Sequence, residues 1–340
     1  GEWITVYENK TKNSFNHIEM LNEKIGYICG NYGTLLKTFD GGKNWFSLNG
    51  ETFPDFMNIT FSDRNRVWVA ALNGNLYFSK NGGISYELTN SIDTYNNFKR
   101  IIFTDPYNGF ILSGTNTLYY TNDSGNSWVK KPFDTGLAFN DISFHRYVGI
   151  IAGDKGIIYS TYNGGTTWLL ENSKTDENLN GCAFFEGNKK IVVGDNGTIL
   201  LSDISNNLWN NVSILTKTKL TKVFTADEKN GWIIGIKPSG TSSVVFRSKS
   251  GGTYWSKTKT EFDFVANDIY FLDEYNGIIA GNGGNIFVTE DGANTWNKLE
   301  MPFKENLYSI SFYENQIGCI AGENGIILRI NKESFTLSLI

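Results

Sequence analysis

Apolar and polar positions along the chain follow one short pattern that returns about every 40 residues. It opens with a Phe or Leu, a polar pair and an apolar-x-Phe step, as in 98–103 and 139–144. Next come a polar turn and a short apolar run that ends near Gly, as in 276–281. An Asn/Asp-x-Gly turn then leads to a further apolar run, as in 198–201. Alternation over such short runs, separated by turn residues, predicts β-strands joined by tight turns.

Each repeat closes on an eight-residue segment that ends in an aromatic residue. The segments are 38–45, 79–86, 121–128, 161–168, 202–209, 248–255 and 289–296, of which 202–209 is a degraded copy. Their terminal aromatics are 41, 42, 40, 41, 46 and 41 residues apart. A period near 40 residues with four strands per repeat is typical of β-propeller blades, so the sequence predicts an all-β, single-domain propeller over residues 1–340.

The blade count depends on the ends of the chain. The first three strands of the pattern occur eight times, the last time at 307–328, but only seven repeats have the closing segment. Residues 2–8 resemble an isolated fourth strand. Because a propeller must close its ring, we expect eight blades, with strand 2–8 completing the last blade beside 306–330. Two alternatives stay open: residues 335–340 could themselves form that strand, or seven blades could carry a divergent appendage.

Composition and charge narrow the function. The chain has 36 Gly, 15 % aromatic residues and only 5 Pro, which suits many short strands and tight turns. Its net charge of −5 argues against nucleic acid as a partner. No apolar run is long enough for a transmembrane helix. The chain starts without Met, which indicates either a trimmed sequence or a mature form whose export signal has been removed. We favour the mature form and expect an extracytoplasmic protein (periplasmic, secreted or anchored at the surface), which an upstream lipid anchor would fit. We also expect a monomer.

One register position of the first strand of each repeat is mostly polar. Aligned over the eight repeats, it holds His17, Asn58, Arg100, Asp141, Gly181, Lys222, Asp268 and Ser309. The next position is apolar in every repeat, and the period of two in a strand places the two positions on opposite faces. If this strand is the innermost one, the polar set lines the channel. We therefore predict that His17, Asn58, Arg100, Asp141, Lys222 and Asp268 contact a ligand over the axis.

Turn residues supply the remaining candidates. Tyr32 is an aromatic residue in a turn otherwise rich in Asn, Asp and Gly, and it is predicted to contact the same ligand. Cys29, Cys182 and Cys319 stand in apolar, strand-like contexts and are expected to be small buried residues without disulfides. No His, Cys and Asp group has the spacing of metal ligands, so we expect no metal and no cofactor.

The closing segment resembles the Asp-box, or BNR, motif Ser/Thr-x-Asp-x-Gly-x-Thr-Trp, most closely at 38–45, 121–128 and 289–296. The phrase at 33–45 looks most like photosystem II stability/assembly factor-like propellers. Asp or Asn can bond nearby backbone N–H groups and Gly permits positive φ, so the box is interpreted as a structural turn. The acidic or amide position of that turn is held by Asp40, Asn81, Asp123, Asn163 and Asp291.

Two function classes follow from this resemblance. Assembly factors imply a non-enzymatic scaffold that binds a protein, and other Asp-box propellers leave a glycan as the second partner. Sialidases and related glycosidases are the enzymatic alternative, with Asp141 and Asp268 as the carboxylate pair. However, these two residues fall three blades apart, and the Arg-Ile-Pro segment of sialidases is missing. The binding scaffold is therefore the favoured hypothesis.

Overall fold

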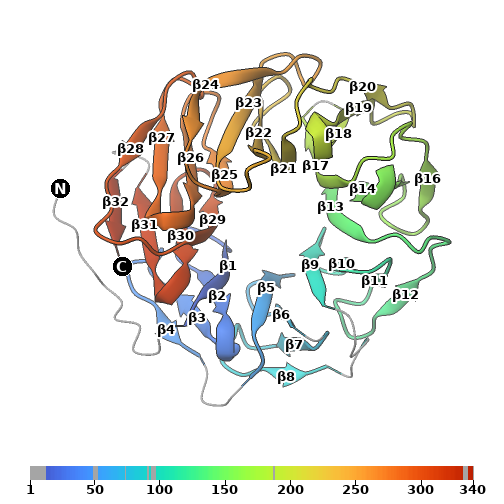
Figure 1. Ribbon diagram of the computed structural model, residues 1–340. Helices are drawn as coiled ribbons and strands as arrows, with labels where there is room; N and C mark the ends of the chain where they lie inside the picture. The colour runs from blue at the N-terminus through green and yellow to red at the C-terminus, as the bar shows by residue number, and fades with distance from the viewer. Residues whose placement is uncertain are drawn as a thin grey trace.

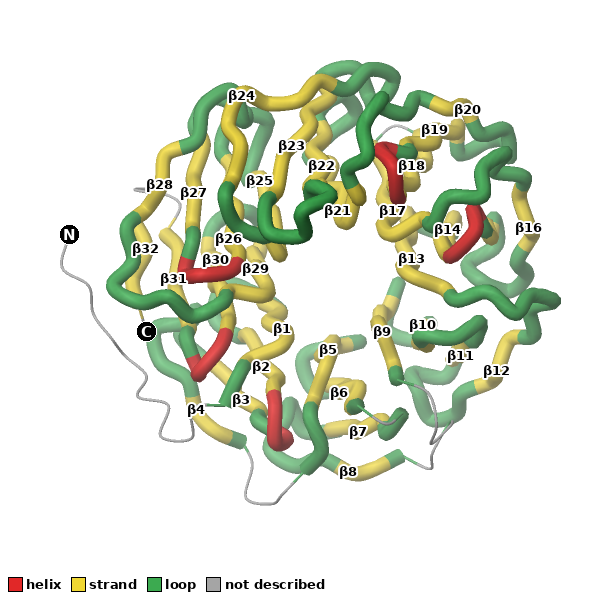
Figure 2. Tube along the Cα trace, in the orientation of Figure 1, coloured by secondary structure: helices red, strands yellow, loops and turns green. Residues whose placement is uncertain are grey.

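The computed structural model describes residues 13–48, 53–72, 74–89, 92, 97–186, 188–331 and 336–339. These residues form eight four-stranded antiparallel sheets, arranged as blades around a central axis (Figures 1 and 2). The predicted eight-bladed, all-β propeller is therefore confirmed. None of the helices in the described ranges has the length and apolar character needed to cross a membrane.

Each blade uses four consecutive strands, from the innermost to the outermost. The first four blades consist of β1 (Phe15–Met20), β2 (Gly26–Gly30), β3 (Leu35–Thr38) and β4 (Phe46–Ser47); β5 (Phe56–Phe61), β6 (Val67–Ala71), β7 (Leu76–Ser79) and β8 (Glu87–Leu88); β9 (Phe98–Phe103), β10 (Gly109–Ser113), β11 (Leu118–Thr121) and β12 (Val129–Lys131); and β13 (Phe139–His145), β14 (Val148–Gly153), β15 (Ile158–Thr161) and β16 (Leu169–Glu171).

The other four blades repeat this order. They consist of β17 (Leu179–Phe185), β18 (Lys189–Gly194), β19 (Ile199–Asp203) and β20 (Asn210–Asn211); β21 (Lys219–Thr225), β22 (Gly231–Ile236), β23 (Ser243–Ser248) and β24 (Ser256–Phe262); β25 (Ala266–Phe271), β26 (Gly277–Gly281), β27 (Ile286–Thr289) and β28 (Asn297–Leu299); and β29 (Leu307–Tyr313), β30 (Ile317–Gly322), β31 (Ile327–Asn331) and β32 (Thr336–Leu339).

The last blade corrects one expectation. Its fourth strand is β32, which pairs antiparallel with β31 from Leu328↔Leu339 to Asn331↔Thr336. The place beside β31 that the sequence analysis gave to strand 2–8 is therefore taken by the C-terminal segment, which was the first alternative. Residues 2–8 themselves lie outside the described residues. Four strands in direct succession complete this blade because the chain supplies a pairing segment just after β31.

Packing between the first and last blades closes the ring. Phe15, Ile18 and Ile28 of blade 1 share a buried cluster with Cys319 and Ala321 of blade 8. The Arg329 Nε–H also donates to the Gly41 carbonyl at 2.7 Å. The ends of the chain are therefore joined by burial of apolar surface and by hydrogen bonds between side chain and backbone.

The tryptophans of the second strands β6 and β22 belong to the core. Trp68 and Trp232 have no exposed surface, and Trp232 stacks on Phe271 with ring centroids 3.5 Å apart. The three cysteines are buried and unpaired, which confirms the expectation for them.

The Asp-box turns bond within themselves and to the turn between the first two strands. In the first box, Asp40 Oδ1 accepts the Thr38 hydroxyl and the Asn44 N–H, both at 2.9 Å, and Thr38 Oγ1 accepts the Gly42 N–H at 2.8 Å. The Gly41 N–H donates to the Lys24 carbonyl at 2.9 Å. The boxes thus lie on the same side of the propeller as the turns between the first two strands, which we call the lower face.

Candidate functional site

Every innermost strand has a register shift just before the polar position of the repeat. In β13 the shift lies between Phe139 and Asp141, and in β25 it lies between Ala266 and Asp268. An extra residue at such a bulge bends a strand and re-aims the side chains beside it. The bulge therefore turns the polar side chain towards the next blade around the ring.

Three neutral ring residues accept a backbone N–H from the innermost strand of the following blade. His17 Nδ1 accepts the Ile59 N–H at 3.4 Å, and Asn58 Oδ1 accepts the Ile101 N–H at 3.2 Å. Ser309 Oγ accepts the Ile18 N–H at 3.4 Å, which carries the same link across the closure of the ring. The polar face of these strands contacts a neighbouring blade, just as the apolar face does.

The charged ring residues form two cation–acid pairs between successive blades. Arg100 Nη1 lies 2.6 Å from Asp141 Oδ1, and Lys222 Nζ pairs with Asp268 Oδ1. The Arg100 and Lys222 side chains are 46 % and 44 % exposed, whereas those of Asp141 and Asp268 are 18 % and 7 % exposed. The cations therefore lie between the solvent and the acids.

Both acids also bond to backbone on the next blade. Asp141 Oδ2 accepts the Cys182 N–H at 3.0 Å, and Asp268 Oδ2 accepts the Ile310 N–H at 2.8 Å. Each carboxylate is thus satisfied from two sides. A carboxyl group that acts as a general acid or base must reach the substrate with a free oxygen, and both oxygens of each of these two acids are already engaged by the protein.

Gly181 is the one ring position that carries no side chain. A Cβ at Gly181 would lie 3.3 Å from the Thr221 carbonyl oxygen and 3.5 Å from Lys222 Cα, so blades 5 and 6 approach closely here.

The structure brings six of the seven predicted ligand contacts together in one ring of innermost strands. The seventh, Tyr32, is not part of this ring and lies in the turn between β2 and β3.

The innermost strand β1 carries two titratable side chains with shifted pKa values, His17 and Glu19. Burial lowers the pKa of His17 to about 4, and the charges of Arg100 and Lys222 add to this effect. Burial raises the pKa of Glu19 to about 8. The hydrogen bond with Thr60 and the charge of Arg100 lower this pKa, but burial has the larger effect. At neutral pH, His17 is therefore uncharged and Glu19 is largely protonated.

The turns between the second and third strands form the opposite, upper face. In four blades the bulge residue is Asn; Asn16 donates to Asn31 Oδ1 at 2.8 Å in its own turn and to the Phe56 carbonyl at 2.7 Å in the next blade. The other three are Asn140, Asn180 and Asn267. These amides fasten each upper turn to the following blade.

Tyr32 stands at the centre of such a turn, η1 (Asn31–Gly33). Its backbone is left-handed (φ 53°, ψ 36°), its N–H donates to Asp55 Oδ1 at 2.7 Å, and its side chain is 74 % exposed. The equivalent residues Lys155, Asn196 and Asn324 have the same backbone geometry. The turn therefore imposes the conformation, and the feature peculiar to Tyr32 is its exposed ring on the upper face.

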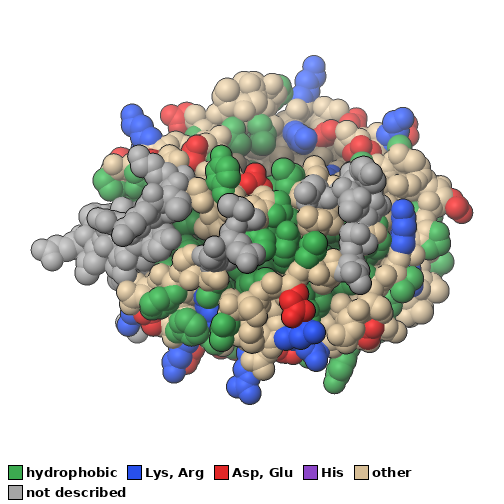
Figure 3. Space-filling model, turned by 90° about the horizontal axis from the view of Figure 1, so that it is seen from below, with side chains coloured by type: hydrophobic (Ala, Val, Ile, Leu, Met, Phe, Trp, Pro, Cys, Tyr) green, Lys and Arg blue, Asp and Glu red, His purple; other side chains and the backbone are tan. Residues whose placement is uncertain are grey.

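The side of the propeller carries charged side chains of both signs. Figure 3 shows a side view in which Lys and Arg side chains are scattered among Asp, Glu and apolar side chains. Such mixed surfaces produce little net field.

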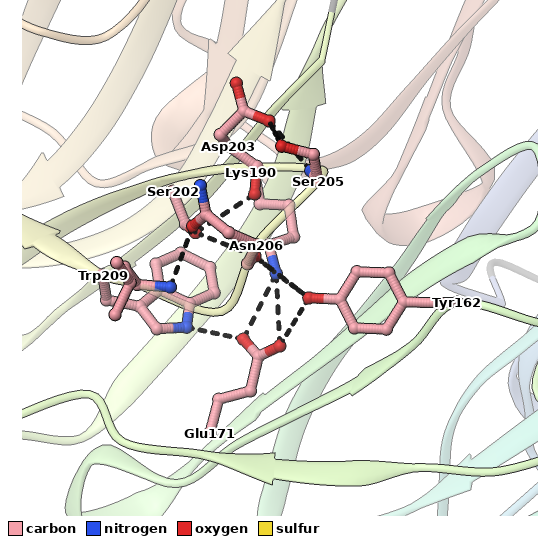
Figure 4. A network of polar contacts seen from close by, with 9 residues as sticks. Tyr162, Glu171, Lys190, Ser202, Asp203, Ser205, Asn206 and Trp209 are labelled. Carbon is pink, nitrogen blue, oxygen red and sulfur yellow. Dashed lines mark hydrogen bonds and ion pairs between the residues drawn. The ribbon is translucent and has the colours of Figure 1, made fainter.

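A buried polar network between blades 4 and 5 was not predicted from the sequence (Figure 4). Lys190 Nζ lies 3.2 Å from Glu171 Oε1, and the Tyr162 hydroxyl bonds both groups at 2.7 Å. Trp209 Nε1–H donates to Glu171 Oε2 at 2.7 Å. Burial lowers the pKa of Lys190, whereas Glu171 raises it.

The sequence held two signals for this network. Lys190 occupies a position that is Gly in six of the other blades, at 26, 109, 149, 231, 277 and 318. The fifth box has Ile204 where the others have an acid, amide or serine. The Lys190 ammonium donates to the Asn206 carbonyl at 3.0 Å, so a buried cation bonds the degraded turn.

No group of three or more His, Cys, Asp or Glu side chains in the described ranges is arranged to hold a metal ion. The candidate site consists of the polar ring, the upper turns and their exposed side chains.

Comparison with known proteins shows which propellers this chain resembles. The family described as "Photosynthesis system II assembly factor YCF48" matches residues 89–172 and 260–331. The photosystem II assembly lipoprotein Ycf48 of a Picosynechococcus species is 23 % identical over 293 residues, covering 81 % of this chain and 84 % of the relative. The chain is an Asp-box propeller similar to these assembly factors. This confirms the resemblance seen in the box motif.

Solved structures support the fold of this Asp-box propeller. A structure titled "YCF48 bound to D1 peptide" has a TM-score of 0.59 at 19 % identity and covers 81 % of this chain and 91 % of its own. The computationally designed Ika8 protein has a TM-score of 0.74 at 12 % identity, with 100 % of both chains covered. Likeness at such low identity concerns the fold, and function must be argued from the site.

Proposed function

We propose that this chain is a non-enzymatic scaffold that holds a segment of a partner protein on its upper face, near the axis. The observation that carries the proposal is the state of Asp141 and Asp268, the only acids at the ring position. Each is held by a cation and by a backbone N–H of the next blade. Neither acid has an oxygen left for acid–base catalysis. Binding by the exposed side chains of the upper face therefore remains the favoured role.

The relatives support a protein as the partner. They are named assembly factors, and one solved relative is titled as bound to a D1 peptide. The names of several relatives as lipoproteins favour the extracytoplasmic location and the upstream lipid anchor expected from the sequence. A polypeptide segment is therefore favoured over a glycan.

Site-specific crosslinking tests this proposal. A photoreactive phenylalanine replaces Tyr32 on the upper face or, as the matched control, Tyr254 in the sixth box on the lower face; the two tyrosines are 74 % and 72 % exposed. We expect a discrete protein adduct in the source cells from position 32 and none from position 254. Adducts from position 254 alone would mean that the partner binds the lower face, which would contradict the proposal.

An activity assay tests the enzymatic alternative. The purified chain is incubated with a panel of sialylated and β-linked polysaccharides, next to the Asp141→Asn and Asp268→Asn variants. We expect no hydrolysis by any of the three proteins. Hydrolysis by the wild-type chain that either variant abolishes would replace the scaffold with a glycosidase.

A further inference from the structure

The turns between the first and second strands of the blades, all on the lower face, differ in length. In five blades this turn has five residues, as at 104–108 in blade 3. In blade 4, His145 pairs with Val148, so the chain reverses within two residues, Arg146 and Tyr147. Arg146 has a left-handed backbone there (φ 56°). The turn of blade 4 therefore covers less of the lower face than the neighbouring turn of blade 3.

A pocket of about 510 Å³ lies between these two turns. Its lining comes from the turn 104–108 of blade 3, from the box of blade 4 around Gly164, and from the half-buried Tyr120 of β11. A Cβ at Gly164 would meet no atom within 4 Å, so the box leaves this side of the pocket open. The exposed Arg146 and Tyr147 complete the lining. Side chains from two blades thus meet around one space on the lower face.

The pocket has charged groups of both signs. Asp105 Oδ1 accepts the Tyr107 and Asn108 N–H groups at 2.8 and 2.9 Å, and its Oδ2 accepts the Asn108 side-chain amide at 2.7 Å. These bonds hold the carboxylate in one orientation. Arg146 is exposed, and it belongs to none of the ion pairs among the described residues. Its guanidinium, with five N–H donors, is therefore available to a ligand.

Hydroxyl groups add acceptors to the pocket. The Tyr120 hydroxyl donates to Asn108 Oδ1 at 2.9 Å, and the Thr166 hydroxyl donates to the Asn163 carbonyl at 3.0 Å. Both oxygens keep lone pairs for a further donor. The Lys131 ammonium donates to the Thr166 carbonyl at 3.1 Å and lies 4.9 Å from the centre of the Tyr120 ring. The pocket can therefore both donate and accept hydrogen bonds.

Tyr147 adds an aromatic ring that is open to solvent. Its side chain is 63 % exposed. Its carbonyl accepts the Gly164 N–H at 2.7 Å, so the short turn is fastened to the box on the other side of the pocket. An aromatic ring is a flat apolar surface with a preferred packing geometry, and in Tyr it carries a polar hydroxyl at one end. The ring therefore stands on a fixed backbone beside the polar groups of the pocket.

The mixture of charges selects the class of ligand. Asp105 repels an anion in this pocket, and Arg146 and Lys131 repel a cation. A neutral ligand with many hydroxyl groups can instead accept from the cations and donate to the carboxylate, and hydrogen bonds to charged groups are the stronger kind. A pyranose ring has such hydroxyl groups, and its C–H face can pack on the ring of Tyr147.

We propose that the pocket between blades 3 and 4 binds a pyranose residue of a neutral polysaccharide. Tyr147 packs on the sugar ring, and Arg146 and Asp105 bond its hydroxyl groups. The pocket lies on the face opposite to the surface proposed for the partner protein. It is therefore a second binding site, and it does not depend on the proposed function.

Calorimetric titration with oligosaccharides tests the pocket. The probes are four neutral hexasaccharides (maltohexaose, cellohexaose, mannohexaose and chitohexaose), each titrated into the whole chain at pH 7. We expect saturable binding of at least one of them at millimolar concentration. No saturation by any of the four up to 10 mM would overturn the proposal.

Variants locate the binding on the chain. Tyr147→Ala should weaken the bound hexasaccharide about tenfold, because it removes the aromatic ring. Tyr147→Phe keeps the ring and should keep most of the affinity. Tyr254→Ala removes an equally exposed tyrosine from the sixth box of the same face and is the matched control, with no effect expected. Equal losses in Tyr147→Ala and Tyr254→Ala would mean that the sugar adsorbs to any exposed tyrosine, which would contradict the proposal.

Two further probes separate a neutral sugar from other ligands. We expect hexagalacturonate to bind no more tightly than the best neutral hexasaccharide, since Asp105 repels its carboxylates. Much tighter binding of hexagalacturonate that Arg146→Gln abolishes would assign the pocket to an acidic glycan and overturn the neutral assignment. A photoreactive phenylalanine at position 147 should give no discrete protein adduct in the source cells. Such an adduct would assign the pocket to a protein and contradict the proposal.

Discussion

The ammonium of Lys190 lies 3.2 Å from the carboxylate of Glu171, and neither side chain has more than 1 % of its surface exposed. The pair joins β18 of blade 5 to β16, the outermost strand of blade 4. The Tyr162 hydroxyl and the Trp209 indole N–H complete the hydrogen bonding of the carboxylate. A fully buried pair is tolerated when its remaining donors and acceptors are satisfied, which is the case for Glu171.

Removing one member of this pair should therefore be costly. We expect Glu171→Gln and Lys190→Met each to lower the free energy of unfolding by about 3–5 kcal/mol, because each leaves an uncompensated buried charge. Urea unfolding followed by tryptophan fluorescence measures this loss. The Glu171→Leu/Lys190→Met double variant should recover most of it, since no lone charge remains. A double variant as unstable as the sum of the single ones would contradict this account.

The link between Asp268 and blade 8 gives a second prediction. Asp268 is 5 % exposed, and its two oxygens accept the Ile269 and Ile310 N–H groups at 2.8 Å. Asn offers one acceptor and points an NH₂ group at a donor, so Asp268→Asn should cost about 2–3 kcal/mol in urea unfolding. Ser309→Ala removes one 3.4 Å hydrogen bond and is the milder control, at about 1 kcal/mol or less. Equal costs would mean that the ring carboxylate does not stabilise the ring.

The pH dependence of stability should depend on Glu19. Its pKa in the folded chain is raised to about 8, first by burial, from an ordinary value of 4.5. Between these values the folded state holds a proton that the unfolded chain releases, so the contribution of Glu19 to stability is present below pH 4.5 and is lost as the pH rises through 8. Glu19→Gln should flatten the decline in urea midpoint between pH 5 and 9. Parallel wild-type and variant curves would show that Glu19 does not titrate in this range.

The box turns should differ in what their central residue contributes. Asp123 Oδ1 accepts the Thr121 hydroxyl at 2.7 Å and the Ser127 N–H at 2.9 Å, and Oδ2 accepts the Ser127 hydroxyl at 2.6 Å. Asp123→Ala should cost about 1–2 kcal/mol. In the sixth box, Ser250 accepts the Tyr254 N–H at 3.0 Å, so Ser250→Ala should cost about half as much. Thermal unfolding of the two variants compares them, and a larger loss in Ser250→Ala would contradict the ranking.

Local sequence was sufficient for the blades. The hydrophobic alternation, the Asp-x-Gly-x-x-Trp turns and the spacing of the aromatics predicted four strands per repeat and eight repeats. These features depend on residues within one repeat, such as Thr38 with Asp40 or Asp123 with Ser127. Hydrogen bonds between near neighbours follow from turn chemistry, which can be seen in the sequence.

The closing strand of the last blade could not be decided from the pattern. Residues 2–8 and 335–340 both alternate in the way of a fourth strand. The structure pairs 336–339 with β31, because the segment that follows a strand directly can fold back on it at a low cost in loop entropy.

By itself, the sequence determined the architecture of this protein and the set of residues at the ring position. Only the tertiary structure decided what those residues contact. The partners of Asn58, Asp141 and Asp268 lie 43, 41 and 42 residues further along the chain, and that of Ser309 lies 291 residues back. A strand period of two assigns a side chain to a face, but the atoms opposite that face depend on how neighbouring blades meet. The way in which neighbouring blades meet also brings Lys190 of blade 5 to Glu171 of blade 4.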